Sequence, residues 1–345
     1  MNNDWKKFLL GQPAHVGEDD VVTFETPDSY PDCALFDLSH LGLISISGED
    51  AESFLQGQLT NDVREVTESH SQMSSYCTPK GRMMANFRLF RHDGAYLMQL
   101  PLETMPTIMK RLPMFILMSK VEVKDVGQEL VRMGLAGSCG PTLLANHFSR
   151  IPEAPGETLS EGEITLIRLP GEEPRFELVG TAGDLITVWT ALAEAGATPG
   201  SSGHWSLLDI QAGIPTILEP TIEAFVPQMT NMQLIDGVSF TKGCYTGQEV
   251  VARMKYLGKL KRRMYLAHCA GEHHPQPGEE LFSSSSQSGQ GAGRVVEAQA
   301  SPGGGYELLA VAEIASVEAD DLHLAAADGP KLSFRDMPYS FEEQA

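Results

Sequence analysis

The sequence of 345 residues is poor in cysteine, in aromatic residues and in basic side chains. Its five cysteines are scattered and form no CxxC pair, which indicates a reducing compartment and no disulfide framework. No run of about 18 apolar residues occurs, so no membrane span is expected. The first ten residues lack the long apolar core and cleavage site of a signal peptide. These absences predict a cytoplasmic protein without disulfides.

Acidic residues outnumber basic ones by 46 to 25, which gives a formal net charge of −21. A charge of this sign and size disfavours broad electrostatic adhesion to nucleic acid. Residues 240–265 are the exception, because they hold seven basic side chains against one acid, +6 locally and −27 for the rest. This stretch either receives an anion, such as a phosphate, or is a solvated charge run between strands.

Hydrophobic periodicity predicts an α+β fold rather than a doubly wound sheet. The expected order is strand, helix, strand, strand, helix, strand, as in a ferredoxin-like unit. The strands are expected at residues 43–46, 85–90, 96–100 and 121–123, and the helices at 51–59 and 104–118. Proline lacks the backbone N–H that a helix interior needs, so Pro113 is expected to end or kink the second helix.

The remainder of the chain predicts two further parts. A second α+β unit is expected over residues 130–200, with a helix at 184–195 whose apolar residues share one face. Another helix is expected to end at Gly213. Beyond residue 259, short apolar runs alternate with breaks rich in Gly, Pro and Ser, which is typical of a small antiparallel barrel or sandwich.

The densest group of chemically special residues is 242–249, KGCYTGQE, with Arg253 and Lys255 following. Its glycines suit positive φ or the close approach of a ligand or another backbone. Cys244 can serve as a nucleophile, a sulfur acceptor or one ligand of a shared metal centre, and the alternative is a small buried cysteine. Lys242, Arg253 and Lys255 can stabilise its thiolate or bind an anionic tail, or they can serve solubility alone.

This block resembles the signature of the YgfZ family, folate-binding, tRNA-modifying proteins related to the aminomethyltransferase of the glycine cleavage system. Further matches follow in order at residues 37–63, 77–91, 119–123 and 337–340. The resemblance implies a three-domain aminomethyltransferase-like fold with folate in a central channel. Its first, discontinuous domain would span residues 30–129 and 204–255, its second α+β domain 130–203, and its C-terminal β-barrel domain 256–340.

The resemblance also implies residues of a folate site. Trp205 matches a family tryptophan that lines the pocket, where an indole face suits a flat heterocycle, and a core tryptophan is the alternative. Leu41 stands where the family has a second pocket tryptophan, so half of that aromatic clamp is missing. Asn231 fits the family spacing upstream of the cysteine and is expected at the channel wall.

Carboxylates can accept the adjacent N–H groups of a pterin ring, which makes Glu219 and Glu249 candidates for folate binding. An acid at a helix start is an equal interpretation of Glu249. The complete predicted set is Cys244, Lys242 and Arg253 as working residues and Trp205, Leu41, Glu219, Asn231, Tyr245, Gln248, Glu249 and Lys255 as cofactor-binding residues. No metal site is predicted, because the His268–Cys269 and His273–His274 spacing fits no zinc site.

The chain departs from the aminomethyltransferases in its second matching block. Ala85 and Asn86 stand where those enzymes carry an acid needed for folate chemistry. The resemblance therefore implies a tetrahydrofolate-binding accessory protein for iron–sulfur cluster assembly or repair that supports tRNA methylthiolation. Its expected partners are folate and iron–sulfur proteins such as tRNA methylthiotransferases, without direct tRNA contact or a membrane. The alternatives are a folate-dependent aminomethyltransferase and a tRNA-binding module built on residues 253–263.

Overall fold

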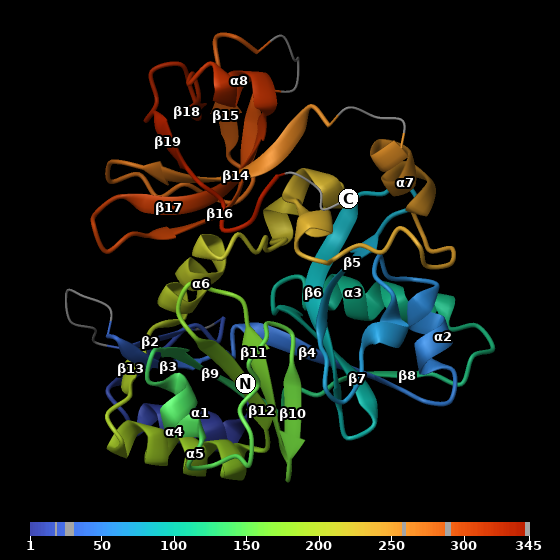
Figure 1. Cartoon of the computed structure of the whole chain (residues 1–345), viewed down its shortest axis with the longest axis vertical. Coiled ribbons are helices and arrows are strands. Elements are labelled where there is room, and N and C mark those ends of the chain that lie inside the picture. The colour runs from blue at the N-terminus through green and yellow to red at the C-terminus, as the bar shows by residue number, and fades with distance from the viewer. Residues whose placement is uncertain (18, 25–30, 257–259, 287–290, 342–345) are drawn as a thin grey trace. The chain divides into compact units, whose positions relative to one another are not determined.

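The computed structural model describes residues 1–17, 19–24, 31–256, 260–286 and 291–341 (Figure 1). The chain divides into two compact units, and both are discontinuous in sequence. The first unit comprises Met1–Phe54, Val63–Gln72 and Arg88–Trp205. The second comprises Leu55–Asp62, Met73–Phe87 and Ser206–Ala345. The three-domain boundaries expected from the resemblance stay a prediction.

A five-stranded sheet contains the predicted ferredoxin-like unit. Its strands, in the order β5-β6-β7-β4-β8, are β5 Gln72–Cys77, β6 Met83–His92, β7 Ala95–Pro101, β4 Leu41–Ser47 and β8 Glu122–Asp125. β6 and β7 form a tight hairpin in which His92 pairs with Ala95, and β4 pairs antiparallel with both β7 and β8. Helices α2 (Ala51–Gln56) and α3 (Met105–Arg111) and strands β4, β6, β7 and β8 occur in the predicted order. β5 is an additional strand between α2 and β6 that the sequence patterns did not predict.

Helix α3 is shorter than the run of residues predicted for it. It ends at Arg111 and continues as a single 3-10 segment, Leu112–Phe115. Pro113 lies in that segment, where its missing N–H and its ring prevent further α-helical bonding. The expected break at Pro113 is therefore confirmed, and residues 116–121 form a loop that leads to β8.

The first unit also contains a six-stranded sheet. Its strands, in the order β10-β11-β12-β9-β3-β13, are β10 Thr158–Glu161, β11 Ile164–Leu169, β12 Arg175–Gly180, β9 Val131–Gly137, β3 Cys33–Asp37 and β13 Thr198–Gly200. The helices of this part are α1 Asn3–Leu10, α4 Gly140–Leu144 and α5 Ala182–Glu194, and β1 Ala14–Val16 pairs with β2 Val22–Phe24. The predicted helix at 184–195 is thus present.

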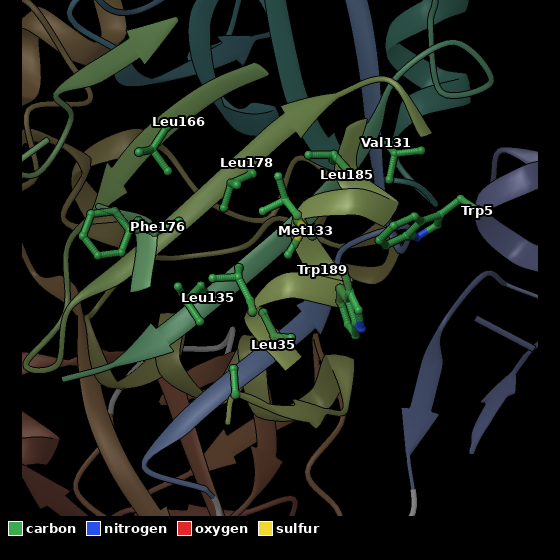
Figure 2. Close-up of a cluster of buried hydrophobic side chains, with 14 of the residues drawn as sticks. Trp5, Leu35, Val131, Met133, Leu135, Leu166, Phe176, Leu178, Leu185 and Trp189 are labelled. Atoms are coloured by element: carbon green, nitrogen blue, oxygen red, sulfur yellow. The ribbon is translucent and has the colours of Figure 1, made fainter. Parts of the chain in front are cut away.

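Helix α5 packs by its apolar stripe. Thr181 caps its N-terminus by accepting a hydrogen bond from the Asp184 N–H, 3.3 Å away. Leu185 and Trp189 point into the same cluster as Met133 and Leu135 of β9, as Figure 2 shows. Burial of such a stripe is the main source of stability for a helix of this length.

The second unit ends in an antiparallel half-barrel sheet. Its strands, in the order β18-β15-β16-β17-β14-β19, are β18 His323–Leu324, β15 Glu280–Phe282, β16 Gly293–Ala300, β17 Tyr306–Glu313, β14 Arg262–Cys269 and β19 Leu332–Arg335. This confirms the small antiparallel architecture expected beyond residue 259. The remaining helices are α6 Ser202–Gln211, α7 Gln248–Tyr256 and α8 Ile314–Glu318, with 3-10 turns Val63–Glu65, Glu219–Thr221, Pro227–Thr230 and Met232–Leu234.

The prediction of a chain without disulfides is wrong. Cys33 and Cys139 form a disulfide, although 106 residues separate them in the sequence. β3 and β9 are antiparallel neighbours that pair Cys33 with Gly137, so Cys139 lies only two residues beyond that pair. Their Cα atoms are 5.8 Å apart, within the range that a disulfide spans. The sheet register brings the two together, and no sequence spacing indicates it.

Cleavage of the Cys33–Cys139 bond is expected to destabilise the first unit. A cross-link across a loop of about 100 residues restricts the unfolded chain, so its loss lowers the free energy of unfolding by about 2–4 kcal/mol. Urea unfolding with and without dithiothreitol measures this difference. The control is the doubly substituted Cys33→Ser, Cys139→Ser chain, whose unfolding midpoint should be the same with and without dithiothreitol. Equal midpoints for the unreduced and reduced wild-type chain would contradict the expectation.

Candidate functional site

The KGCYTGQE loop is fixed to the second unit by its lysine. Lys242 is 5% exposed, and its ammonium donates hydrogen bonds to the Leu59 and Asn61 carbonyl oxygens, each at 2.7 Å. The Ser239 N–H binds the Thr60 carbonyl beside them at 3.0 Å. Since hydrogen bonds from a charged donor are stronger than neutral ones, this lysine holds the start of the loop in place. The contacts of Lys242 thus position the backbone of the KGCYTGQE loop against residues 59–61.

The second glycine of the loop packs against a neighbouring turn. Gly247 has φ of +85°, and a Cβ built on it would lie 2.5 Å from the Thr78 carbonyl oxygen and 3.0 Å from the Gly81 Cα. Those neighbours are backbone atoms that cannot rotate away, so only glycine fits. Thr78 and Gly81 close their own turn, in which the Gly81 N–H binds the Thr78 carbonyl at 2.8 Å. The loop is therefore fixed at both ends.

Cys244 lies between these two fixed points and is exposed. The structure describes all five cysteines, and of the three outside the disulfide Cys244 is the exposed one. Burial raises the pKa of the Cys77 thiol to about 12, and burial also raises the pKa of Cys269. Reaction of a thiol requires access, and among the three cysteines outside the disulfide Cys244 is the accessible one. The buried-cysteine alternative does not hold for it.

Tyr245 turns inward where Cys244 turns outward. Its side chain is buried, and its ring centroid lies 5.2 Å from the Lys242 ammonium. Burial is the main reason that the pKa of the Tyr245 phenol is raised, with the nearby Cys77 adding to it. The phenol therefore stays protonated and contributes an anchor for the loop. Lys242, Tyr245 and Gly247 together present Cys244 at the surface.

Helix α7 begins at the last two residues of the motif. The Gln248 side chain donates to the Gly243 carbonyl at 3.4 Å, and the exposed Glu249 pairs with Arg253 one turn along. The Lys255 ammonium lies 4.1 Å from the centre of the Phe240 ring. An exposed pair one helical turn apart adds little stability, so a ligand that binds Glu249 or Arg253 would separate the pair at small cost.

Trp205 lies in the first unit with its ring covered. It is 2% exposed, and its ring centre is 5.2 Å from the Arg175 guanidinium and 5.2 Å from the Phe36 ring centre. A Cβ on Gly134 would meet the indole at 2.4 Å, so the β9 backbone touches it directly. Leu41, the first residue of β4, is half-buried opposite Pro101. Both residues belong to the first unit, and the cysteine loop belongs to the second.

Glu219 and Asn231 lie in the second unit in different settings. Glu219 is exposed at the start of a 3-10 turn. Asn231 is buried with φ of +59°, and its amide donates to the Met264 carbonyl at 2.9 Å and to the Tyr339 hydroxyl at 3.3 Å. Its carbonyl oxygen Oδ1 is buried without a hydrogen-bond partner among the described residues. A buried acceptor of this kind suits a ligand that brings an N–H donor.

Asn86 occupies its position as an amide, not as a surrogate acid. Its Nδ2 donates to the Pro215 carbonyl at 2.6 Å, and its Oδ1 accepts from the Ile217 N–H at 2.8 Å. The residue is buried, and the neighbouring Ala85 is fully so. A carboxylate at this position would satisfy the Ile217 N–H but would face the Pro215 carbonyl oxygen with another acceptor. The position therefore carries a structural hydrogen-bonding task that needs a neutral donor.

Replacement of Asn86 by aspartate is expected to lower the free energy of unfolding by about 1–3 kcal/mol at neutral pH. Burial and the facing carbonyl would raise the pKa of the new carboxyl above its usual value near 4. The penalty is therefore small below about pH 4, where the acid is neutral in both states, and grows as pH rises. Urea midpoints at pH 5 and pH 8 measure it, with Asn86→Ala as the control whose loss does not change with pH.

The basic stretch of residues 240–265 is largely engaged within the chain. Arg253 pairs with Glu249, Lys255 lies over Phe240, Arg262 pairs with Glu313 at 3.0 Å, and Arg263 lies over Phe341 at 4.4 Å. Lys259 lies outside the described residues. In the described part of the stretch, these internal contacts offset part of the positive charge. The stretch is therefore less suited to bind the phosphates of a nucleic acid.

Neither metal ligation nor membrane crossing has a visible basis in the described part of the chain. The described side chains include no group of three or more His, Cys, Asp or Glu arranged to hold a metal ion. His268 contacts Glu307 at 3.3 Å and His273 contacts Glu279 at 2.9 Å. Among the described helices, none combines the length and apolar composition that crossing a membrane requires.

Sequence reasoning missed the partners of the loop. The Leu59 and Asn61 carbonyl oxygens leave no trace in a side-chain pattern, because the contact is made by backbone. The turn that receives Gly247 does leave a signal, since Pro79-Lys80-Gly81 is a typical turn sequence. The sequence does not show that this turn packs against Gly247, because the two are brought together only by the fold.

Comparisons with known proteins support the resemblance. Residues 18–204 match the family model described as the GCVT N-terminal domain. The chain is 39% identical over 248 residues to the tRNA-modifying protein YgfZ of Colwellia psychrerythraea, covering 72% of this chain and 74% of that one. It is 34% identical over 309 residues to the same protein of an Enterobacter species, covering 90% and 94%.

A solved structure has the same fold. The glycine cleavage system aminomethyltransferase T of Bartonella henselae superimposes with a TM-score of 0.74 over 98% of this chain and 97% of that one, at 14% identity. At that identity the likeness establishes the fold and not the activity. The relatives at 34–39% identity, aligned over most of their own length, establish more. The chain belongs to the YgfZ family and carries its GCVT N-terminal domain.

Proposed function

We propose that this chain is a tetrahydrofolate-binding accessory protein that supports the assembly or repair of iron–sulfur enzymes, including those that methylthiolate tRNA. Cys244 is its working residue, and tRNA is affected through client enzymes. The curated relatives are named tRNA-modifying proteins, and the matched domain is that of the glycine cleavage T family. The strongly acidic chain is consistent with an indirect role on tRNA.

One observation carries the proposal: Cys244 is exposed on a loop that is fixed on both sides. Lys242 and Gly247 hold the loop through backbone contacts, while the cysteine between them faces solvent. A loop built only for packing would bury its cysteine, as the chain does with Cys77 and Cys269. A fixed, accessible thiol can pass sulfur to a partner protein. As a thiolate it can also act as a transient ligand of a metal centre that a partner shares.

Folate binding rests on the family and on the acceptors of the second unit. The unpartnered Oδ1 of Asn231 and the exposed carboxylates of Glu219 and Glu249 fit a ring that carries adjacent N–H donors. Trp205 fits less well, because its indole is 2% exposed and is covered by Arg175, by Phe36 and by the backbone at Gly134. Bound tetrahydrofolate would supply a carrier of one-carbon units. Asn86 is an amide that is hydrogen-bonded to the Pro215 carbonyl, so this position supplies no acid to a bound tetrahydrofolate.

Complementation tests the function directly. A bacterial strain that lacks its own family member is expected to regain methylthio-modified nucleosides in its tRNA when it expresses this chain, as measured by mass spectrometry. Tetrahydrofolate binding is measured separately on the purified protein by isothermal titration calorimetry. Absence of rescue by a well-expressed, folded chain would contradict the accessory role. Absence of folate binding would contradict the cofactor assignment alone.

A further inference from the structure

The Cys33–Cys139 disulfide joins the two strands on which Trp205 packs. β3 and β9 are antiparallel neighbours, and Phe36 lies opposite Gly134 three residue pairs beyond the pair that contains Cys33. The ring centres of Phe36 and Trp205 are 5.2 Å apart, and a Cβ on Gly134 would lie 2.4 Å from the indole. Since each residue advances a strand by about 3.3 Å, the bond lies about 10 Å along the strands from this contact. The disulfide and the cover of Trp205 therefore belong to one strand pair.

The packing around Phe36 leaves little room for one strand to shift against the other. Gly200 of β13 pairs with Phe36 on the side of β3 away from Gly134, and a Cβ on Gly200 would lie 2.6 Å from the Phe36 ring. Phe36 thus fills the space beside Gly200, and Trp205 fills the space beside Gly134. Because both rings rest on backbone in a close-packed interior, a shift of β3 against β9 moves the groups that cover the indole.

The two ends of β3 are held in different ways. Asp37, its last residue, accepts a hydrogen bond from the buried Trp5 indole at 2.6 Å. Cys33, its first residue, is joined covalently to Cys139. Strand ends open first when a local constraint is lost. Loss of the disulfide should therefore loosen residues 33–36, which include one of the covers of Trp205, while the Asp37 end stays fixed.

The disulfide is placed where a thiol can reach it. Cys33 and Cys139 are half-buried, whereas Cys77 and Cys269 are buried. Exchange requires attack of a thiolate on one sulfur, so access decides whether the bond can react. The proposed function places the chain beside tRNA and its iron–sulfur enzymes, where thiols are kept reduced. In such a compartment a reachable disulfide is a transient state of the chain and not a permanent cross-link.

We propose that the Cys33–Cys139 bond is a reversible redox switch that controls access to the Trp205 indole. A thiolate of a dithiol reductant attacks one sulfur of the bond and forms a mixed disulfide, and the second thiol of the reductant then displaces the chain. Cys33 and Cys139 gain two electrons and two protons and become thiols, and the reductant becomes a disulfide. A disulfide oxidant of the glutathione class reverses both steps.

Reduction is expected to favour the binding of a planar ligand at Trp205. In the oxidised chain the indole is 2% exposed, and two of its covers, Phe36 and the backbone at Gly134, lie on the strands that the bond joins. Loosened strands allow a heterocycle to displace Phe36 from the indole. Apparent affinity rises with the fraction of chains in which a site is open. This step rests on the proposed function, since tetrahydrofolate is the heterocycle that the proposed function supplies.

Hydrogen exchange measured by mass spectrometry tests the switch without any ligand. Dithiothreitol in the absence of urea should convert the folded chain from three thiols to five, counted by alkylation in urea after the reductant is removed. The amides of residues 33–36 and 134–137 should then exchange at least about tenfold faster, and oxidised glutathione should restore the slow rate. Strands β14 and β17 of the second unit are the internal control, whose exchange rates should not change.

Isothermal titration calorimetry with 5-formyltetrahydrofolate tests the effect on binding. The oxidised wild type is compared with the Cys33→Ala, Cys139→Ala chain, which cannot form the bond, so both are measured in one buffer without reductant. The variant should bind at least about threefold more tightly, because its site is open in a larger fraction of chains.

A bond that dithiothreitol reduces only in urea would overturn the switch, as would exchange rates at residues 33–36 that reduction leaves unchanged. Equal affinities of the oxidised wild type and the variant would overturn control of the indole. If neither chain binds 5-formyltetrahydrofolate, the folate assignment fails, and the exchange rates still decide whether the bond is a switch. Rescue of tRNA methylthiolation is measured separately, so a failed switch leaves the accessory role standing.

Discussion

Replacement of Lys242 by methionine is expected to lower the free energy of unfolding by about 2–4 kcal/mol. The ammonium donates to the Leu59 and Asn61 carbonyl oxygens, and methionine fills a similar volume but leaves both acceptors unpaired in a buried place. The KGCYTGQE loop should then lose its fixed start, so support of tRNA methylthiolation should fall as well. Urea unfolding measures the first effect and complementation the second.

The control for this variant is Lys255→Met, which removes an exposed lysine from the same basic stretch. Its stability is expected to stay within about 0.5 kcal/mol of wild type, because its ammonium is near solvent. Equal effects of the two substitutions would mean that the Lys242 hydrogen bonds are not what holds the loop.

The second large effect is expected at Arg132. This guanidinium is buried in the first unit, where its charge faces those of Asp37 and Glu177. Asp37 accepts hydrogen bonds from the Trp5 indole at 2.6 Å and from the Ser39 hydroxyl at 2.7 Å. Arg132→Met removes the cation and leaves buried carboxylates uncompensated, which should cost about 3–5 kcal/mol.

The cost of Arg132→Met should depend on pH. Burial raises the pKa of the Asp37 carboxyl above its usual value, and the Trp5, Ser39 and Arg132 interactions hold that rise in check. Without Arg132 the pKa rises further. A raised pKa favours the neutral acid in the folded state, so the penalty is absent below about pH 4 and grows as pH increases.

Urea midpoints of Arg132→Met at pH 5 and pH 8 should therefore diverge from wild type more at the higher pH. Arg150→Met is the matched control, since Arg150 forms an exposed pair with Glu157 in the same unit. It is expected to cost at most about 1 kcal/mol. A loss at Arg132 that is the same at both pH values would show that packing, not charge, dominates there.

Sequence patterns predict the elements whose conformation depends on residues close to each other in the chain. The β6–β7 hairpin follows from two runs in which apolar and polar residues alternate. Between them lie Asp93 and Gly94, and both of these residues have positive φ, as a tight turn requires. Helix α5 follows from its apolar stripe, and the end of α3 follows from Pro113. In each case the residues that decide the conformation lie within one or two turns of each other in the sequence.

Contacts between distant segments could not be predicted in this way. The Cys33–Cys139 bond depends on the register of β3 against β9, and the burial of Lys242 depends on carbonyl groups about 180 residues earlier. The sequence predicts a helix through residues 114–118, but the α-helix ends at Arg111, and Met114, Phe115, Leu117 and Met118 are exposed. An apolar run in the sequence does not distinguish side chains that are buried from side chains that are exposed. Cys244 could be singled out from the sequence, but its exposure between two fixed residues required the structure.

The central claim is that Cys244 is the working residue of an accessory protein for tRNA methylthiolation. The measurement that tests it most directly is the methylthio-nucleoside content of tRNA in a complemented deletion strain. Wild type and Cys269→Ala, which alters a buried cysteine, should restore the modification, whereas Cys244→Ser should not, at equal levels of folded protein. Restoration by Cys244→Ser to the wild-type level would contradict the claim.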